Sequence, residues 1–184
     1  AASKGIPLYR WIGEMAGSPA ALLPIPQMNV VNGGRHADND LDVQEFMILP
    51  RGESFAEALR CGSEVFHQLK KILGEEKRVT SVGDEGGFAP RADSIRQVLG
   101  WLVQASEKAG YRPGRDLHFA LDVAASGRWS NGVYRLRTEE GLKKTADEIV
   151  DFYRRLSDEF PLTSIEDGLS EEDWEGWVRL TRVL

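Results

Sequence analysis

Carboxylates, amides and a histidine occur in a few short segments that follow apolar runs of the chain. The candidate residues lie in four places: Asn32–His36, Gln44–Glu45, Gly83–Gly87, and the pair Asp122 and Glu166 with Asp167. In folds built from parallel strands, sites assemble at the C-terminal ends of the strands, because the loops that follow converge there. Carboxylate oxygens in such a place are ligands for a hard divalent cation.

Asp122 and Glu166 are the clearest pair of this kind. Asp122 follows the apolar run 119–121 and Glu166 follows residues 163–165, at a spacing that fits one strand–helix–strand step. Two carboxylates that end adjacent parallel strands would face one pocket, and this arrangement suits Mg²⁺. A single Asp or Glu at a strand end is more often a helix N-cap or a solvated residue. The pair alone therefore leaves both interpretations open.

Glu45, Glu85 and His36 carry weaker signals when each is taken alone. Glu45 lies inside an apolar strand pattern, where an unpaired carboxylate costs free energy to bury, so it needs a partner or a task. Asp84 and Glu85 lie between glycines and fit a simple turn, although more glycines surround them than one turn requires. His36 in its glycine-rich loop fits a surface residue equally well.

The elements that must position these residues follow the order β-β-α-α-β-α-β-α. Expected strands cover residues 25–31, 43–49, 117–123 and 162–165. A short helix over residues 4–17 precedes them, and a break at Pro24 and Pro26 marks a possible domain boundary. The later alternation of strand and helix predicts parallel strands.

Capping signals and apolar periodicity predict the helices. Ser54 opens the first of the four, whose expected buried face is Phe55, Leu59, Val65, Phe66, Leu69 and Ile72. The second runs from Asp93 to about Ala109. Thr145 and Glu148 have capping-box spacing before the third. Ser170 is expected to cap the fourth, in which Trp174 and Trp177 form core and helix-packing surface.

Composition excludes several classes of protein. The chain has 184 residues, a formal net charge of −6 and 41% hydrophobic residues. An acidic balance without a Lys/Arg-rich stretch argues against nucleic-acid or anionic-membrane partners, and no apolar run reaches the roughly 20 residues of a membrane span. Cys61 is the only cysteine, which excludes an internal disulfide and favours a reducing compartment. We expect it to be a packing residue.

Six segments together resemble enolase, the phosphopyruvate hydratase family. They are Leu23–Asp38, Val43–Met47, Gly62–Phe66, Val82–Pro90, Leu121–Ser126 and Ser164–Leu169, in order and with natural spacing. The resemblance runs over essentially the whole chain. It implies an α/β fold, a partial TIM-type (β/α)8 barrel that opens β-β-α-α, continues in βα units and is truncated at both ends. A complete barrel takes about 250 residues.

The resemblance implies the reversible dehydration of 2-phosphoglycerate to phosphoenolpyruvate in glycolysis and gluconeogenesis, with Mg²⁺ as cofactor. Enolase-superfamily sites use a Lys or His base with one or two Mg²⁺ ions, and the departing hydroxide requires a general acid. Carried over by motif, the catalytic residues are Glu85, Glu45 and His36, the substrate-binding residues are His36, Gln44 and Glu45, and the metal ligands are Asp122 and Glu166. Glu85 would be the acid, with Glu45 holding the shared proton.

Other features depart from the family pattern. Gly127 and Arg128 stand where enolases usually have a Glu and an aromatic residue, and Arg35 receives no role. A third metal carboxylate, a catalytic lysine and a phosphate-binding Arg–Ser pair belong to later strands of the family, outside these 184 residues. We therefore expect a segment of an enzyme whose isolated form is inactive.

The resemblance also divides the chain and suggests its setting. Residues 1–22 would be the end of an N-terminal capping domain with its linker, and residues 23–184 the first half of the barrel domain. The full-length enzyme is expected to be a cytoplasmic homodimer or higher homo-oligomer, and family members are also reported at the cell surface. The alternative is an enolase-like protein kept for a structural or binding role without catalysis.

Overall fold

The computed structural model describes residues 1–18, 23–137 and 143–184. Its main sheet has the strand order β1–β2–β3–β7, where β1 is Met28–Asn32, β2 Glu45–Pro50, β3 Leu117–Asp122 and β7 Leu162–Glu166. β2 is antiparallel to β1 and to β3, whereas β3 and β7 are parallel, as predicted. The sheet is open rather than closed into a barrel, which confirms the expected partial barrel.

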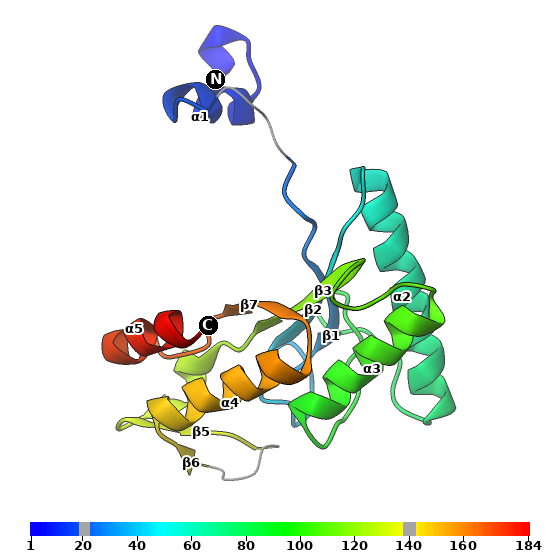
Figure 1. The fold of residues 1–184 in the computed structure, drawn as a ribbon, viewed down its shortest axis with the longest axis vertical. Helices are drawn as coiled ribbons and strands as arrows, with labels where there is room; N and C mark the ends of the chain where they lie inside the picture. The colour runs from blue at the N-terminus through cyan, green and yellow to red at the C-terminus, as the bar shows by residue number, and fades with distance from the viewer. Residues whose placement is uncertain (19–22, 138–142) are drawn as a thin grey trace.

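Five α-helices accompany the strands in the described residues. They are α1 (Leu8–Met15), α2 (Phe55–Glu75), α3 (Ile95–Lys108), α4 (Ala146–Glu159) and α5 (Trp174–Val183). The helix α1 lies apart from the sheet, and α2 and α3 lie side by side against it (Figure 1). Short 3₁₀ helices cover Ala2–Lys4 (η1) and Ala125–Arg128 (η2). Within the described residues, no helix combines the length and the apolar character that a membrane span requires.

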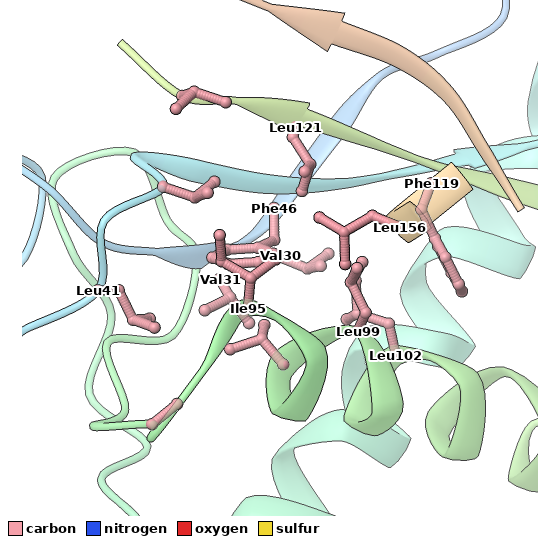
Figure 2. Packing of buried hydrophobic residues seen from close by; sticks show 14 of the residues in the cluster. Val30, Val31, Leu41, Phe46, Ile95, Leu99, Leu102, Phe119, Leu121 and Leu156 are labelled. Atoms are coloured by element: carbon pink, nitrogen blue, oxygen red, sulfur yellow. The ribbon is translucent and has the colours of Figure 1, made fainter. Parts of the chain in front are cut away.

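The hydrophobic core lies between one face of the sheet and the helices α3 and α2. Phe46 of β2 and Phe119 of β3 are fully buried and point toward Leu99 and Leu102 of α3 (Figure 2). Because side chains alternate along a strand, the neighbouring residues of β2 and β3 point to the opposite face of the sheet. That opposite face is available for polar residues.

Local capping chemistry explains where three helices begin. The hydroxyl of Ser54 accepts a hydrogen bond from the Glu57 N–H at 3.2 Å, and that of Ser94 accepts from Gln97 at 3.1 Å. Thr145 begins α4 with a complete capping box, since the carboxylate of Glu148 also accepts from the Thr145 N–H at 2.7 Å. These side chains satisfy N–H groups that have no partner inside the helix.

The expected buried face of α2 is partly wrong. Phe55 and Leu59 are each 50% exposed, whereas Ala58, Val65 and Leu69 are buried. Leu59 is one residue further along than Ala58 and therefore lies about 100° around the helix from the buried stripe. Phe55 is in the first turn and lines a surface groove beside residues 23–26 instead of the core. Cys61 is buried as a packing residue, as expected.

The last helix begins three residues later than predicted. Asp173, not Ser170, caps α5 by accepting a hydrogen bond from the Gly176 N–H at 2.9 Å. Trp174, as the first residue of the helix, is 77% exposed and is not a core residue. Trp177 is half-buried, and its indole N–H donates to the Ser170 carbonyl at 2.9 Å.

A second, small sheet lies in a segment expected to be a long loop. It consists of β4 (Trp129–Ser130), β5 (Val133–Arg135) and β6 (Lys143–Lys144), all antiparallel. Strands of two or three residues are too short to show a period of two in the sequence. Tyr134 anchors this sheet, because its buried hydroxyl donates to Asp173 at 2.8 Å and accepts from the Ser170 N–H at 3.0 Å.

Candidate active site

Four polar residues form one row across one end of the main sheet, where the strands begin or end. In the strand register, Asn32 of β1 is opposite Glu45 of β2, Glu45 is opposite Asp122 of β3, and Asp122 is opposite Glu166 of β7. Residues that are directly opposite in a sheet point to the same face. Because β2 runs against its neighbours, its first residue meets the last residues of the other three strands. The topology thus brings together residues that are far apart in sequence.

The position of Glu45 differs from the one expected. The sequence pattern places Glu45 inside a strand over residues 43–49, whereas β2 begins at Glu45 itself. The residues before it form a loop that the structure ties to β3, since the Gln44 N–H donates to the Asp122 carbonyl at 2.9 Å. Glu45 is therefore a residue of the sheet edge, with a side chain that is 15% exposed.

Two loops bring His36 and Glu85 to Glu45. His36 belongs to the loop between β1 and β2, and its Nδ1 lies 3.4 Å from Glu45 Oε1 and 3.6 Å from Glu85 Oε2. Glu85 belongs to the segment between α2 and α3, in a turn closed by a hydrogen bond from the Gly83 N–H to the Gly87 carbonyl at 2.8 Å. Ligand atoms of these three residues all lie within 4.8 Å of one another.

The carboxyl of Glu45 is the most strongly perturbed acid of this cluster. Burial, a hydrogen bond with Glu85 and the negative charges of Glu85, Asp122 and Glu166 together raise the pKa of Glu45 from 4.5 to about 7. Two carboxyls that share a hydrogen bond hold one proton between them at neutral pH, because both cannot be ionised without repulsion. The arrangement can therefore store a proton and deliver it to a bound molecule.

This pKa shift predicts that the metal-free protein loses stability as the pH rises from about 4.5 to about 7. The folded state holds the Glu45 proton up to a pKa of about 7, whereas the unfolded chain releases it near 4.5. Between these values the folded state binds more protons, so the free energy of unfolding falls with rising pH. The variant Glu45→Gln cannot ionise and should show a flatter slope. Urea unfolding at a series of pH values, in the presence of a metal chelator, measures the slope of stability against pH.

Glu107 offers the matched control for this experiment, because it is an exposed carboxylate on α3. The Glu107→Gln variant should keep the wild-type slope of stability against pH. Equal slopes for the wild type and Glu45→Gln would contradict the assignment of the raised pKa to Glu45.

Asp122 and Glu166 lie beside this cluster as adjacent strand ends. The Asp122 carboxylate accepts hydrogen bonds from the Ala124 N–H at 3.0 Å and from the Gln44 side-chain amide at 3.5 Å. Burial raises the pKa of both carboxyls, and for Glu166 the charge of Asp122 raises it further. A cation between two such carboxylates would relieve their repulsion. All-oxygen donors of this kind fit Mg²⁺.

The distances within the described residues also single out His36, Glu45 and Glu85 as a group that could hold a metal ion. An imidazole with two carboxylates is a donor set that suits transition metals better than Mg²⁺. Because the pKa of Glu45 is about 7, protons compete with a cation for this group near neutral pH. For Mg²⁺, the pair Asp122 and Glu166 has the better chemistry.

A polar pocket of about 560 Å³ opens beside the row of strand ends. Gln44, Ala124, Asp167, Arg35 and Arg128 are among the residues that line it. The lining includes chain neighbours of Glu45, Asp122 and Glu166, namely Gln44, Val123 and Asp167, and not these three carboxylates themselves. Sequence reasoning assigned no role to Arg35, because the other residues that line the pocket come from segments distant in the chain.

An ion pair that sequence reasoning missed joins the loops around this pocket. Asp42 is 1% exposed at its side chain and lies 3.0 Å from the Arg128 guanidinium, which also donates to the Leu41 carbonyl at 3.3 Å. The second carboxylate oxygen of Asp42 accepts from the Arg137 N–H at 2.7 Å. The pair ties the loop before Gln44 to the segment after Asp122. Arg128 departs from the family pattern at its position, and this departure was the signal in the sequence that could have pointed to the ion pair.

Breaking this pair should destabilise the protein strongly. Replacing Arg128 by Met removes one partner of the buried ion pair with Asp42, and such a removal typically costs about 3–5 kcal/mol. The exposed pair Arg154 and Asp158 on α4 is the control, because Arg154→Met should cost less than about 1 kcal/mol. Urea unfolding of both variants measures the two losses, and equal losses would contradict a structural role for Arg128.

The comparison with protein families adds one finding. Residues 20–184 match a family model described as "Enolase, C-terminal TIM barrel domain". The match covers the main sheet and the helices α2 to α5.

Proposed function

The chain belongs to the enolase family, and we propose that it is a segment of an enzyme that interconverts 2-phosphoglycerate and phosphoenolpyruvate. The forward reaction removes a proton next to a carboxylate and expels hydroxide from the neighbouring carbon. The observation that carries the proposal is the His36–Glu45–Glu85 cluster directly beside the strand ends Asp122 and Glu166. This arrangement would combine groups that deliver a proton with groups that bind a cation, at the end of the sheet where these strands begin or end.

Glu85 is the general acid in this proposal. Hydroxide is a poor leaving group, so it must be protonated as its bond to carbon breaks. Glu85 is 47% exposed at its side chain and can reach a bound substrate, whereas Glu45 is largely buried behind it. With a pKa of about 7, Glu45 can share the proton that Glu85 delivers. His36 contacts both carboxyls and helps to orient the leaving hydroxyl.

Asp122 and Glu166 would hold Mg²⁺, for which their paired oxygens are suited. When bound, the cation would stabilise the additional negative charge that proton removal creates on the substrate carboxylate. Gln44 assists twice, because its side-chain amide donates to Asp122 and also lines the polar pocket. The base that removes the proton is proposed to come from a region of the enzyme outside these residues.

The wider setting follows from the same proposal. Residues 1–22 are proposed as the end of the capping domain with its linker, and residues 23–184 as the first half of the barrel domain. The complete enzyme is proposed to be cytoplasmic and homo-oligomeric.

The test follows phosphoenolpyruvate absorbance for the complete enzyme and for the isolated 184 residues. We expect turnover with the complete enzyme and Mg²⁺, and no turnover with the isolated chain, which also should bind Mg²⁺ weakly. An inactive complete enzyme would favour the alternative, an enolase-like protein with a structural or binding role. Turnover by the isolated chain would overturn the assignment of the base to another region.

A further inference from the structure

Asn32 contacts several of the segments that carry the candidate site residues. Its backbone is opposite Glu45 in the register of β1 and β2, and its N–H donates to the Phe88 carbonyl at 2.8 Å. Its carbonyl accepts from the Asn39 side chain at 3.0 Å. The loop that carries His36 begins with the next residue, Gly33, whose carbonyl accepts from the His36 N–H at 3.0 Å. Three segments of the site thus meet at one residue.

The side chain of Asn32 fills the space against the turn that carries Glu85. A Cβ atom built on Gly83 would lie 2.5 Å from Asn32 Nδ2, and one built on Gly87 would lie 2.2 Å from Asn32 Oδ1. Real Cβ atoms do not approach other atoms so closely. The Asn32 amide thus lies against both ends of the turn, one end of the amide at each glycine. A Cβ on Gly83 would also lie 2.5 Å from the His36 carbonyl oxygen, and one on Gly87 would lie 2.9 Å from the Val31 nitrogen.

The burial of this amide is unfavourable by itself. Asn32 is fully buried, and its side-chain nitrogen and oxygen have no hydrogen-bond partner among the described residues. A buried polar group without a partner costs free energy that an apolar residue of similar size would avoid. Such a group calls for an explanation, and its contacts point to the placement of the turn.

We propose that Asn32 is a positioning residue that holds the turn Gly83–Gly87, and with it Glu85, against Glu45 and His36. The inference rests on the proposed function, in which Glu85 is the acid. The amide acts as a rigid wedge between the two glycines. Without this side chain, Gly83 and Gly87 lose a packing contact, so the Glu85 carboxyl moves away from Glu45 and His36.

The first experiment measures kinetics of the complete enzyme with Asn32→Ala. We expect kcat to fall by about tenfold or more while KM changes by less than about threefold, because Glu85 contributes chiefly in the transition state. Ser106→Ala is the control, since Ser106 is an equally buried polar residue in α3 whose hydroxyl donates to the Leu102 carbonyl. An unchanged kcat in Asn32→Ala would overturn the inference.

The second experiment tests the contact between the amide and the glycine. Gly87→Ala should lower kcat strongly in the wild type and several-fold less strongly in the Asn32→Ala background, because the nearest clash has been removed. Gly100→Ala in α3 is the matched glycine control, since a Cβ there meets nothing within 4 Å. Equal losses from Gly87→Ala in both backgrounds would contradict the wedge.

A crystal structure of the complete Asn32→Ala enzyme separates this inference from the proposed function. We expect the Glu85 carboxylate to be displaced by about 1 Å or more relative to the wild type, which exceeds the precision that catalytic groups tolerate. An unmoved Glu85 would refute the positioning role even in an active enzyme. An inactive wild type with a displaced Glu85 in the variant would refute only the proposed reaction.

Discussion

Replacing Glu85 by Gln in the complete enzyme is expected to lower kcat for 2-phosphoglycerate by about a hundredfold to ten-thousandfold. Glutamine has nearly the same shape but carries no transferable proton, so the departing hydroxide would leave without protonation. The KM should change little, because the contribution of the acid develops as the carbon–oxygen bond breaks. Steady-state measurement of phosphoenolpyruvate formation gives both constants.

Two comparisons make this experiment specific. The Glu85 side chain is 47% exposed in its turn, so the Glu85→Gln protein should unfold at the same urea concentration as the wild type within error. Glu107→Gln removes an equivalent charge from the surface of α3 and should leave kcat unchanged. Rates like those of the wild type in Glu85→Gln would place the acid elsewhere, and Glu45 would be the next residue to replace.

Helix positions could be predicted from the sequence where local interactions, such as capping hydrogen bonds, determine them. Thr145 and Glu148 predicted a helix start that the structure confirms with a complete capping box. The prediction that Ser170 caps the last helix was wrong. Asp173 can also accept the capping hydrogen bond, and it lies three residues nearer to the first helical turn. Where two acceptors compete within one loop, tertiary contacts decide, and here Tyr134 fixes Ser170 through its N–H.

For the site, the sequence could supply only a list of candidate residues and not their arrangement. The motif resemblance named Glu45, Glu85 and His36, and the structure brings all three within contact distance. The pattern of residues 43–49 could not reveal that β2 starts at Glu45, because the start depends on hydrogen bonds with β1 and β3. Arg128 could not be paired with Asp42 from the sequence either, because 85 residues lie between them and their approach depends on the tertiary fold.

The same register explains why the proposed acid residues and the proposed cation ligands adjoin each other. Glu45 has Asn32 on one side and Asp122 on the other, so each residue of the row has a fixed neighbour. The negative charges of Asp122 and Glu166 help to raise the pKa of Glu45. A cation at these two carboxylates would weaken that effect, so metal binding and the shared proton should be energetically coupled.

Removing either proposed metal ligand should weaken Mg²⁺ binding by about a hundredfold or more. Loss of an outer-sphere partner typically costs 10–100-fold, so loss of a ligand oxygen sets at least the upper end of that range. We therefore expect Asp122→Asn and Glu166→Gln in the complete enzyme to lose Mg²⁺ binding in calorimetric titrations without substrate. Gln44→Ala should cost less, since Gln44 contacts Asp122 through one long hydrogen bond of 3.5 Å.

The pH dependence of this binding follows from the carboxyl groups themselves. Because burial raises the pKa of Asp122 and Glu166, protons compete with the metal at a higher pH than for ordinary carboxylates. The affinity for Mg²⁺ should therefore fall as the pH is lowered below neutrality. The control is Asp158→Asn, at an exposed residue of α4, which should bind Mg²⁺ like the wild type. Full Mg²⁺ affinity in Asp122→Asn and in Glu166→Gln would show that the cation is held by other residues, with the His36, Glu45 and Glu85 group as the first to examine.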